Sequence, residues 1–252
     1  MEAVVFDGKT LSLKYQKDYP LPKISNDDEL IVKIEYSGIC GTDLHIIQGE
    51  FPASKDRPLP LGHESSGVIT AVGKNSIFKV GQKVAIDPNC ACDLCDFCRN
   101  GKYQYCLSAG INSTIGIFRD GGWAEYCVVP QQQVFALPDG ITTEQGVGKV
   151  MEISINYMRP GGKYVLFGCC PPTHQVSLNP FDIYNKELTI IGVKINPFSF
   201  PSAIGWLKAM GSRYVDYHKL GVKTYRLSEY EAALEDLKTG SVSKAIFKIN
   251  SD

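Results

Sequence analysis

Four cysteines near the middle of the chain have the spacing of a metal site. Two residues separate Cys92 from Cys95 and Cys95 from Cys98, and seven separate Cys98 from Cys106. Zn²⁺ takes four thiolates tetrahedrally in closed structural sites, so this segment predicts a structural zinc. Cys90 is a fifth thiol beside the set and an alternative ligand, but the repeated two-residue spacing favours the other four.

A second set of metal-binding residue types is divided between two segments. Cys40 lies within residues 38–45 (GICGTDLH), and His63 and Glu64 follow Gly62. One thiolate, one imidazole and one carboxylate could form an open zinc site, with a coordination position left for water or substrate. A Cys or His in an apolar context is also common in protein cores, so the residue types alone leave both interpretations open.

Cysteine usage and the N-terminus indicate the compartment. The chain has nine cysteines, and clustered thiols in a reducing compartment more often bind metal than form disulfides. Residues 1–8 predict a short strand and lack the basic start and long apolar run of a secretory signal, so we expect a cytoplasmic protein. Cys127, on an apolar strand, and Cys169 and Cys170, at the end of another, are expected to be packed core thiols.

Composition limits the class of partner. The 252 residues are 44% hydrophobic and 21% charged, as in ordinary globular proteins, and no long apolar run suggests a membrane span. With 26 basic and 27 acidic residues, the formal net charge is −1, which gives no electrostatic basis for binding nucleic acid or an anionic membrane. A small-molecule partner is therefore expected. The length favours two folding units over one.

The elements that would position these residues differ between the two parts of the chain. Up to residue 138, short β-rich runs alternate with Gly, Pro and Asp, as in all-β folds, and the apolar spacing becomes helical only near residues 40–47. After residue 138 the pattern is α/β. It predicts helices at 150–158 and 204–210, strands at 163–167 and 188–193, a capped helix from Ser228 to Leu237, and a last strand at 244–249.

Together these motifs resemble the zinc-dependent medium-chain dehydrogenase/reductase family. The resemblance is closest to its polyol branch, the sorbitol dehydrogenases and threonine dehydrogenase-like members, and it covers nearly the whole chain. The matching segments are residues 40–45 (CGTDLH), 62–69 (GHESSGVI), the cysteine lobe 92–106, 121–126 (GGWAEY), 134–138 (VFALP) and 159–168 (RPGGKYVLFG).

The resemblance implies a mixed β and α/β fold in three parts. Residues 1–140 would form a GroES-like, β-rich catalytic domain that includes a zinc lobe at 88–107. Residues 147–217 would form an incomplete Rossmann-like unit. Residues 218–252 would return to the catalytic domain, with the final strand closing its sheet.

The resemblance also implies a chemistry. Cys40, His63 and Glu64 would hold a catalytic zinc, directly or through water, and this zinc would act as a Lewis acid on a substrate hydroxyl before hydride transfer to NAD⁺. Thr42 would accept the hydroxyl proton, and His45 would pass it to bulk water. The alternatives are that Thr42 only begins a helix and that His45 only lies on an exposed polar face.

One family element is missing from the sequence. A dinucleotide site needs a strand, a Gly-x-Gly-x-x-Gly turn and a helix, but the nearest string, residues 146–151 (GVGKVM), lacks the third glycine and follows a polar run. About 70 residues separate Val147 from Tyr217, whereas a doubly wound unit needs on the order of 150. We hypothesise an internal deletion, by splicing or engineering, at residues 147–149.

The proposed deletion affects which function we expect for this chain. The family activity is zinc-dependent hydride transfer between a polyol or secondary alcohol and NAD(P), and we expect it to be impaired here. The alternative is a non-catalytic, zinc-binding truncated isoform or a partner subunit of a full-length dehydrogenase. A zinc-free quinone reductase is disfavoured by the retained Cys and His residues. Strands that have lost their neighbours predict exposed apolar surface and association, as a homo-oligomer or with a full-length subunit.

Overall fold

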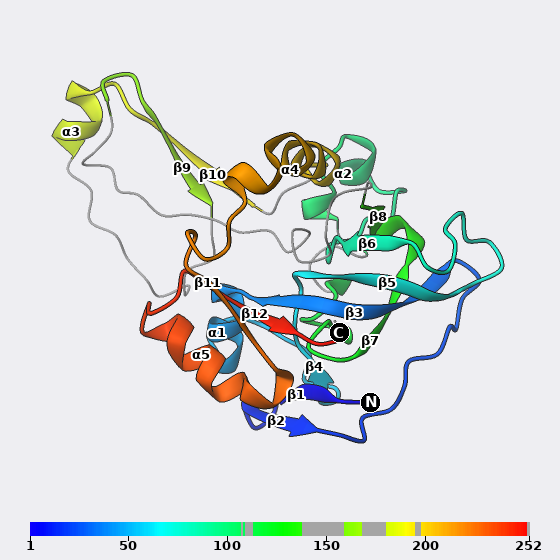
Figure 1. Ribbon diagram of the computed structural model, residues 1–252. Coiled ribbons are helices and arrows are strands. Elements are labelled where there is room, and N and C mark those ends of the chain that lie inside the picture. The colour runs from blue at the N-terminus through cyan, green and yellow to red at the C-terminus, as the bar shows by residue number, and fades with distance from the viewer. Residues whose placement is uncertain (107, 109–112, 138–158, 168–179, 195–197, 251–252) are drawn as a thin grey trace.

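The computed structural model describes residues 1–106, 108, 113–137, 159–167, 180–194 and 198–250. Strands dominate as far as residue 136, in agreement with the predicted β-rich domain (Figure 1). The elements there are β1 (Ala3–Asp7), β2 (Ser12–Gln16), β3 (Glu29–Ile39), α1 (Gly41–Ile47), β4 (Leu59–Pro60), β5 (Ser65–Val72), β6 (Lys83–Ile86), α2 (Asp96–Arg99), η1 (Tyr103–Tyr105), β7 (Tyr126–Pro130), η3 (Gln131–Gln133) and β8 (Val134–Ala136).

The later elements are fewer. They are β9 (Lys163–Phe167), α3 (Pro180–Asn185), β10 (Thr189–Val193), α4 (Phe200–Tyr214), β11 (Val222–Tyr225), η6 (Leu227–Glu229), α5 (Tyr230–Lys238) and β12 (Lys244–Lys248). The expected strands at 163–167, 188–193 and 244–249 and the expected helix at 204–210 are all present. The helix expected at 150–158 lies outside the described residues, as do Cys169 and Cys170.

A seven-stranded sheet organises the β-rich part. Its order is β11-β12-β3-β5-β6-β8, with β7 also paired to β3. One edge of the long strand β3 is shared, because residues 29–33 pair with β7 and residues 36–39 pair with β12. The last strand of the chain therefore closes the sheet that carries the first metal-binding segments. A smaller antiparallel sheet, β2-β1-β4, lies beneath it in Figure 1.

The core follows from alternation along these strands. Leu30, Val32 and Ile34 occupy every second position of β3 and are fully buried, as expected for a strand with one face on the core. A second cluster fills the space between the two sheets, α1 and α5. In it the ring of Trp123 packs edge-on against Phe247 of β12, with ring centroids 5.4 Å apart.

The Rossmann-like part is reduced to one parallel pair among the described residues. β9 pairs with β10, and together with α3 they extend away from the large sheet (Figure 1). Several large apolar side chains there are exposed, which agrees with strands that lack neighbours. They include Val165, Phe181, Tyr184, Val193 and Trp206.

The start of α5 differs from the prediction. Ser228 was expected to cap this helix with Glu231, but a short 3-10 turn over Leu227–Glu229 precedes α5 instead. The Glu229 carboxylate accepts the Arg226 backbone N–H at 2.7 Å. Leu227 is only 3% exposed, so burying this side chain begins the turn one residue before the predicted cap. Among the described residues, no helix combines the length and apolarity needed to cross a membrane.

Candidate metal centres

The end of β3 and the start of α1 position Cys40. Cys40 is the residue before α1, with extended backbone angles, and its N–H donates to Asp43 Oδ2 at 2.8 Å. The Asp43 N–H donates back to the Cys40 carbonyl at 3.0 Å. Asp43 is fully buried, so these reciprocal bonds fix the turn that presents the thiol. A carboxylate at a helix N-terminus is also favoured by the helix dipole.

A tight loop between β4 and β5 presents His63. Gly62 has a φ of +96°, and a Cβ added there would lie 2.3 Å from Trp123 Cδ1, so glycine is required for both conformation and space. The Gly122 N–H donates to the Gly62 carbonyl at 2.8 Å, and Trp123 N–H donates to Leu61 at 2.9 Å. The glycine-rich segment after Asp120 therefore holds the His63 loop in place.

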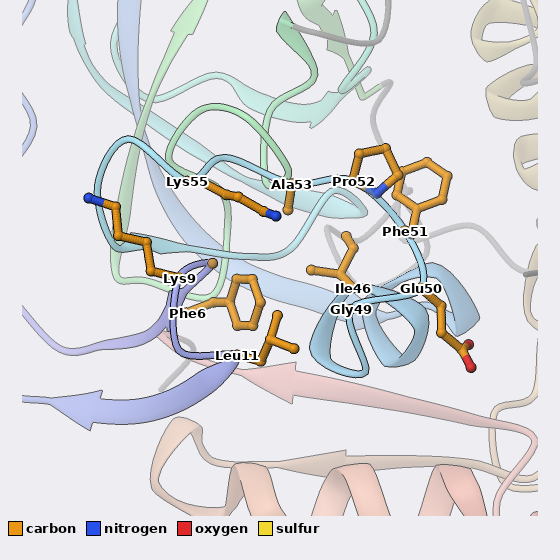
Figure 2. Close-up of a pocket in the computed structure, with 11 residues that line it drawn as sticks. Phe6, Lys9, Leu11, Ile46, Gly49, Glu50, Phe51, Pro52, Ala53 and Lys55 are labelled. Carbon is orange, nitrogen blue, oxygen red and sulfur yellow. The ribbon is translucent and has the colours of Figure 1, made fainter.

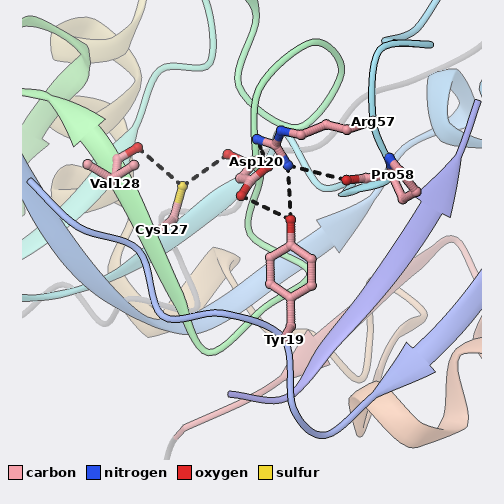
Figure 3. Close-up of polar contacts among 6 residues, drawn as sticks. All are labelled: Tyr19, Arg57, Pro58, Asp120, Cys127 and Val128. Carbon is pink, nitrogen blue, oxygen red and sulfur yellow. Dashed lines mark hydrogen bonds and ion pairs between the residues drawn. The ribbon is translucent and has the colours of Figure 1, made fainter. Parts of the chain in front are cut away.

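A polar cluster anchors that glycine-rich segment from the other side (Figure 3). Arg57 Nη2 donates to Asp120 Oδ1 at 2.5 Å, and Arg57 Nη1 donates to the Tyr19 hydroxyl at 3.0 Å. The Tyr19 hydroxyl donates in turn to Asp120 Oδ2 at 3.2 Å. Cys127, predicted as a core thiol, is 1% exposed and donates to the Asp120 carbonyl. Burial raises the pKa of Cys127 to about 12, which keeps it a neutral thiol.

The same Asp43 orients His63. His63 Nδ1 lies 3.3 Å from Asp43 Oδ1, inside the protein. Burial lowers the pKa of His63, but the Asp43 carboxylate and the Cys40 thiol outweigh burial and raise that pKa well above its usual range. With Nδ1 turned to the carboxylate, Nε2 is left to bind a metal, the arrangement by which carboxylates orient metal-binding imidazoles.

The three residues of the predicted open site come together in the fold. The donor atoms of Cys40, His63 and Glu64 all lie within 4.8 Å of one another. A tetrahedral zinc holds its ligand atoms about 3.5 Å apart, so donor atoms gathered within 4.8 Å of one another are close enough to share one ion. The zinc role of these residues stays a prediction, and the donor set fits that metal.

Charge at the site favours a cation. Glu64 Oε2 forms an ion pair with Nζ of Lys244, whose side chain is 8% exposed. The acidic groups of Asp43, Glu64 and Cys40 are set against two basic groups, the Lys244 ammonium and the His63 imidazole. Because a metal binds the thiolate and the neutral imidazole, its binding would release protons from Cys40 and His63, and the positive charge of the ion would replace theirs.

The two predicted relay residues lie on α1. The Cys40 thiol donates to Thr42 Oγ1 at 3.6 Å, so the hydroxyl is beside the candidate metal ligand. His45 is three residues further, on the same side of the helix, and its Nδ1 pairs with Glu50 Oε2 at 2.7 Å. Glu50 is exposed, so this pair leads from α1 towards solvent. Proton relay stays a prediction.

The four-cysteine lobe is compact. The Sγ atoms of Cys92, Cys95, Cys98 and Cys106 all lie within 4.8 Å of one another, and those of Cys92 and Cys98 are 3.9 Å apart. Zn–S bonds of about 2.3 Å place tetrahedral sulfurs about 3.8 Å apart, so the spacing of Cys92 and Cys98 matches two ligands of one zinc. Backbone N–H groups of Leu94 and Cys95 point at Cys92 and lower its pKa, which favours the thiolate. Cys90 is not a member of the group.

Sequence reasoning missed three side chains that shape the open site. Asp43 could have been found, because it stands three residues after Cys40 at a helix start. No sequence pattern near Glu50 or Lys244 indicates that these residues lie at the open site. The partner of Lys244 lies 180 residues earlier in the chain and is reached only through the pairing of β12 with β3.

Comparison with known proteins agrees with this architecture. The model of the alcohol dehydrogenase GroES-like domain matches residues 26–139. The D-xylulose reductase A of Aspergillus niger is 35% identical over 166 residues, which cover 62% of this chain and 45% of that protein. The chain thus spans less than half the length of this curated relative.

Solved structures share the fold. A candidate zinc-binding dehydrogenase from Sinorhizobium meliloti, solved with NADP, matches with a TM-score of 0.79 at 22% identity over 98% of each chain. A cobalt- and zinc-bound alcohol dehydrogenase from Pyrobaculum aerophilum matches with a TM-score of 0.77 at 19% identity, over 98% of this chain and 99% of that one.

These features define a GroES-like dehydrogenase domain joined to a partial Rossmann-like unit. Residues 26–139 match the alcohol dehydrogenase GroES-like domain, and 166 residues of the chain are similar to a D-xylulose reductase.

Proposed function

We propose that this chain is a two-zinc polyol dehydrogenase relative that keeps the alcohol-activating half of the reaction and has lost most of the dinucleotide half. The activity it descends from is hydride transfer between a polyol or secondary alcohol and NAD(P). The observation that supports this proposal most strongly is the meeting of Cys40, His63 and Glu64 around a buried Asp43. The likeness to a D-xylulose reductase supports a polyol as the substrate class.

The residues of the open site would have three roles: metal binding, orientation of a ligand and proton transfer. Zinc held by Cys40, His63 and Glu64 would supply Lewis acidity towards a substrate hydroxyl. Asp43, whose Oδ1 lies 3.3 Å from His63 Nδ1, would orient the ring and leave Nε2 for the metal. Thr42 Oγ1, next to the Cys40 thiol, is placed to take the hydroxyl proton, and the His45–Glu50 pair is placed to carry a proton onward to water.

The second zinc would be structural. Four thiolates complete a tetrahedral shell and leave no position for substrate, so Cys92, Cys95, Cys98 and Cys106 would stabilise the lobe without taking part in chemistry. The lobe supports a later element, because Tyr103 packs edge-on against Phe198, just before α4, with ring centroids 5.1 Å apart.

The residues do not fit NAD(P). The sequence has no Gly-x-Gly-x-x-Gly turn, and among the described residues the Rossmann-like sheet consists of β9 and β10 alone. The nearest string, residues 146–151, lies outside the described residues. We therefore derive no step through the nicotinamide and expect weak turnover or none.

Titration of the zinc-loaded protein with NADH, followed by nicotinamide fluorescence, tests whether the chain keeps its zinc sites and has lost its dinucleotide site. We expect zinc to be retained and NADH binding to be weaker than millimolar. Saturable binding near micromolar, with oxidation of NADH on adding D-xylulose, would show a working cofactor site and overturn the proposed loss.

A second candidate function is that of a non-catalytic subunit. The observation in its favour is the exposed apolar surface on β9, β10, α3 and α4, which a full-length dehydrogenase subunit could cover. Size-exclusion chromatography with light scattering, of the chain alone and mixed with a full-length relative, tests it. A mixed species supports this function, and two unchanged separate peaks oppose it.

A further inference from the structure

A cavity lies between the β1–β2 hairpin and α1 (Figure 2). Its volume is about 430 Å³, within the range of small-molecule sites, and none of its lining residues belongs to the metal-binding groups. The walls come from the β1–β2 hairpin, from α1 and from the segment that follows α1. It is lined by Phe6, Gly8, Lys9, Leu11, Ile46, Gly49, Glu50, Phe51, Pro52, Ala53 and Lys55.

The floor of this cavity is apolar. Phe6 and Ile46 are each 1% exposed, so they are rigid parts of the core, and Leu11 lies beside them in Figure 2. Leu11 is 43% exposed and has a φ of 54°, a left-handed conformation that is uncommon for leucine. Turns of this kind favour Gly, Asn or Asp. Here the hairpin instead holds a large apolar side chain against the open cavity.

The hairpin and α1 fit closely along this wall. A Cβ added at Gly49 would lie 2.8 Å from Leu11 Cδ1, so the glycine after α1 makes room for the leucine. Gly8 is similarly constrained, because a Cβ there would lie 2.2 Å from the Ser54 carbonyl oxygen. The two segments are therefore held together at fixed positions, and the cavity between them is preformed.

The charged side chains that line the cavity point in different directions. In Figure 2 the Lys55 side chain runs across the space above the apolar floor, whereas Lys9 points outward. No ion pair or hydrogen bond of the Lys55 ammonium occurs among the described residues. The one acidic lining residue, Glu50, turns its carboxylate away from the cavity and pairs it with His45. The cavity thus offers a cation and no competing anion.

We propose that this cavity binds a small amphipathic monocarboxylate, with its apolar body against the exposed Leu11 at the edge of the apolar floor and its carboxylate on the Lys55 ammonium. A polyol would leave its hydroxyls unpaired over that floor. A phosphate dianion would need more donors than one ammonium supplies. Because Glu50 lines the cavity and also holds His45, an occupant would contact the segment that carries the predicted proton path.

Titration with octanoate tests the proposal, with octanol and octylammonium as probes of equal length and different charge. Isothermal titration should give saturable octanoate binding with a Kd of about 1 mM or tighter, as expected for ten heavy atoms. Lys55→Gln should weaken octanoate about tenfold, because it removes a charge-assisted contact, and should leave octanol within about twofold. Lys14→Gln, at an exposed lysine outside the cavity, should change neither.

A second variant tests the location independently of charge. Ala53→Phe fills the cavity from its wall and should abolish binding of octanoate and octanol together, with thermal unfolding and zinc content confirming that each variant folds. The proposal is overturned if octanoate does not saturate, if octylammonium binds as tightly as octanoate, or if Lys14→Gln loses as much affinity as Lys55→Gln. None of these readouts depends on turnover.

Discussion

Replacing Lys244 with methionine would test how the last strand supports the open metal site. The Lys244 side chain is 8% exposed and that of Glu64 is 20% exposed, so the substitution leaves a largely buried carboxylate without its partner. Breaking a fully buried ion pair costs about 3–5 kcal/mol, and water at the partly exposed Glu64 reduces this. We expect a loss of about 2–3 kcal/mol in the free energy of unfolding of the metal-free protein.

Urea unfolding followed by tryptophan fluorescence measures this loss, because Trp123 packs against Phe247 on the same strand. Lys248→Met is the matched control: it makes the same change at an exposed position of β12 and should cost less than about 0.5 kcal/mol. Adding Glu64→Gln to the Lys244 variant should restore part of the stability by removing the stranded charge. Equal losses in the free energy of unfolding for the Lys244 and Lys248 variants would show that the ion pair with Glu64 does not stabilise the protein.

Three further predictions concern the scaffold and the lobe. Gly62→Ala should destabilise by more than about 2 kcal/mol in thermal unfolding, because the new Cβ meets a buried indole, whereas Gly81→Ala, also at positive φ but in open space, should cost about 1 kcal/mol. Cys98→Ser should release about one zinc per chain by elemental analysis, and Cys90→Ser should release none. Hydrogen bonds from Lys223 and Tyr225 lower the pKa of Asp236 to about 2. The ionised carboxylate therefore stabilises the fold above about pH 4, and this stabilisation is lost as the pH falls towards 2. Urea unfolding should therefore show a larger deficit for Asp236→Asn at pH 7 than at pH 2.5, and equal deficits at the two pH values would contradict this.

Local features of this protein could be predicted from its sequence. The cysteine lobe is formed within one short segment, so its spacing alone indicates which four thiols meet. The alternating burial of β3 and the short helix at 41–47 follow from side-chain periodicity. The predicted donor set of the open site could also be named from the sequence, because the resemblance placed Cys40 and the His63–Glu64 pair in one site.

Contacts between distant segments could not be predicted in this way. The ion pair between Lys244 and Glu64 depends on the register of β12 on β3, which no local pattern encodes. The same holds for the cavity, whose floor combines Phe6 of β1 with Ile46 of α1. The start of α5 was misplaced for a related reason, because the burial of Leu227 in the tertiary core overrides the capping preference of Ser228.

The zinc content of the purified chain tests the central claim most directly. Elemental analysis of the unaltered protein and of a Cys40→Ser/His63→Ala double variant would count the metal at each centre, with circular dichroism confirming the fold. We predict about two zinc ions per chain in the first and about one in the second, retained by the four-cysteine lobe. Equal zinc content in the two proteins would show that no zinc is held by Cys40 and His63 and would contradict the proposed alcohol-activating site.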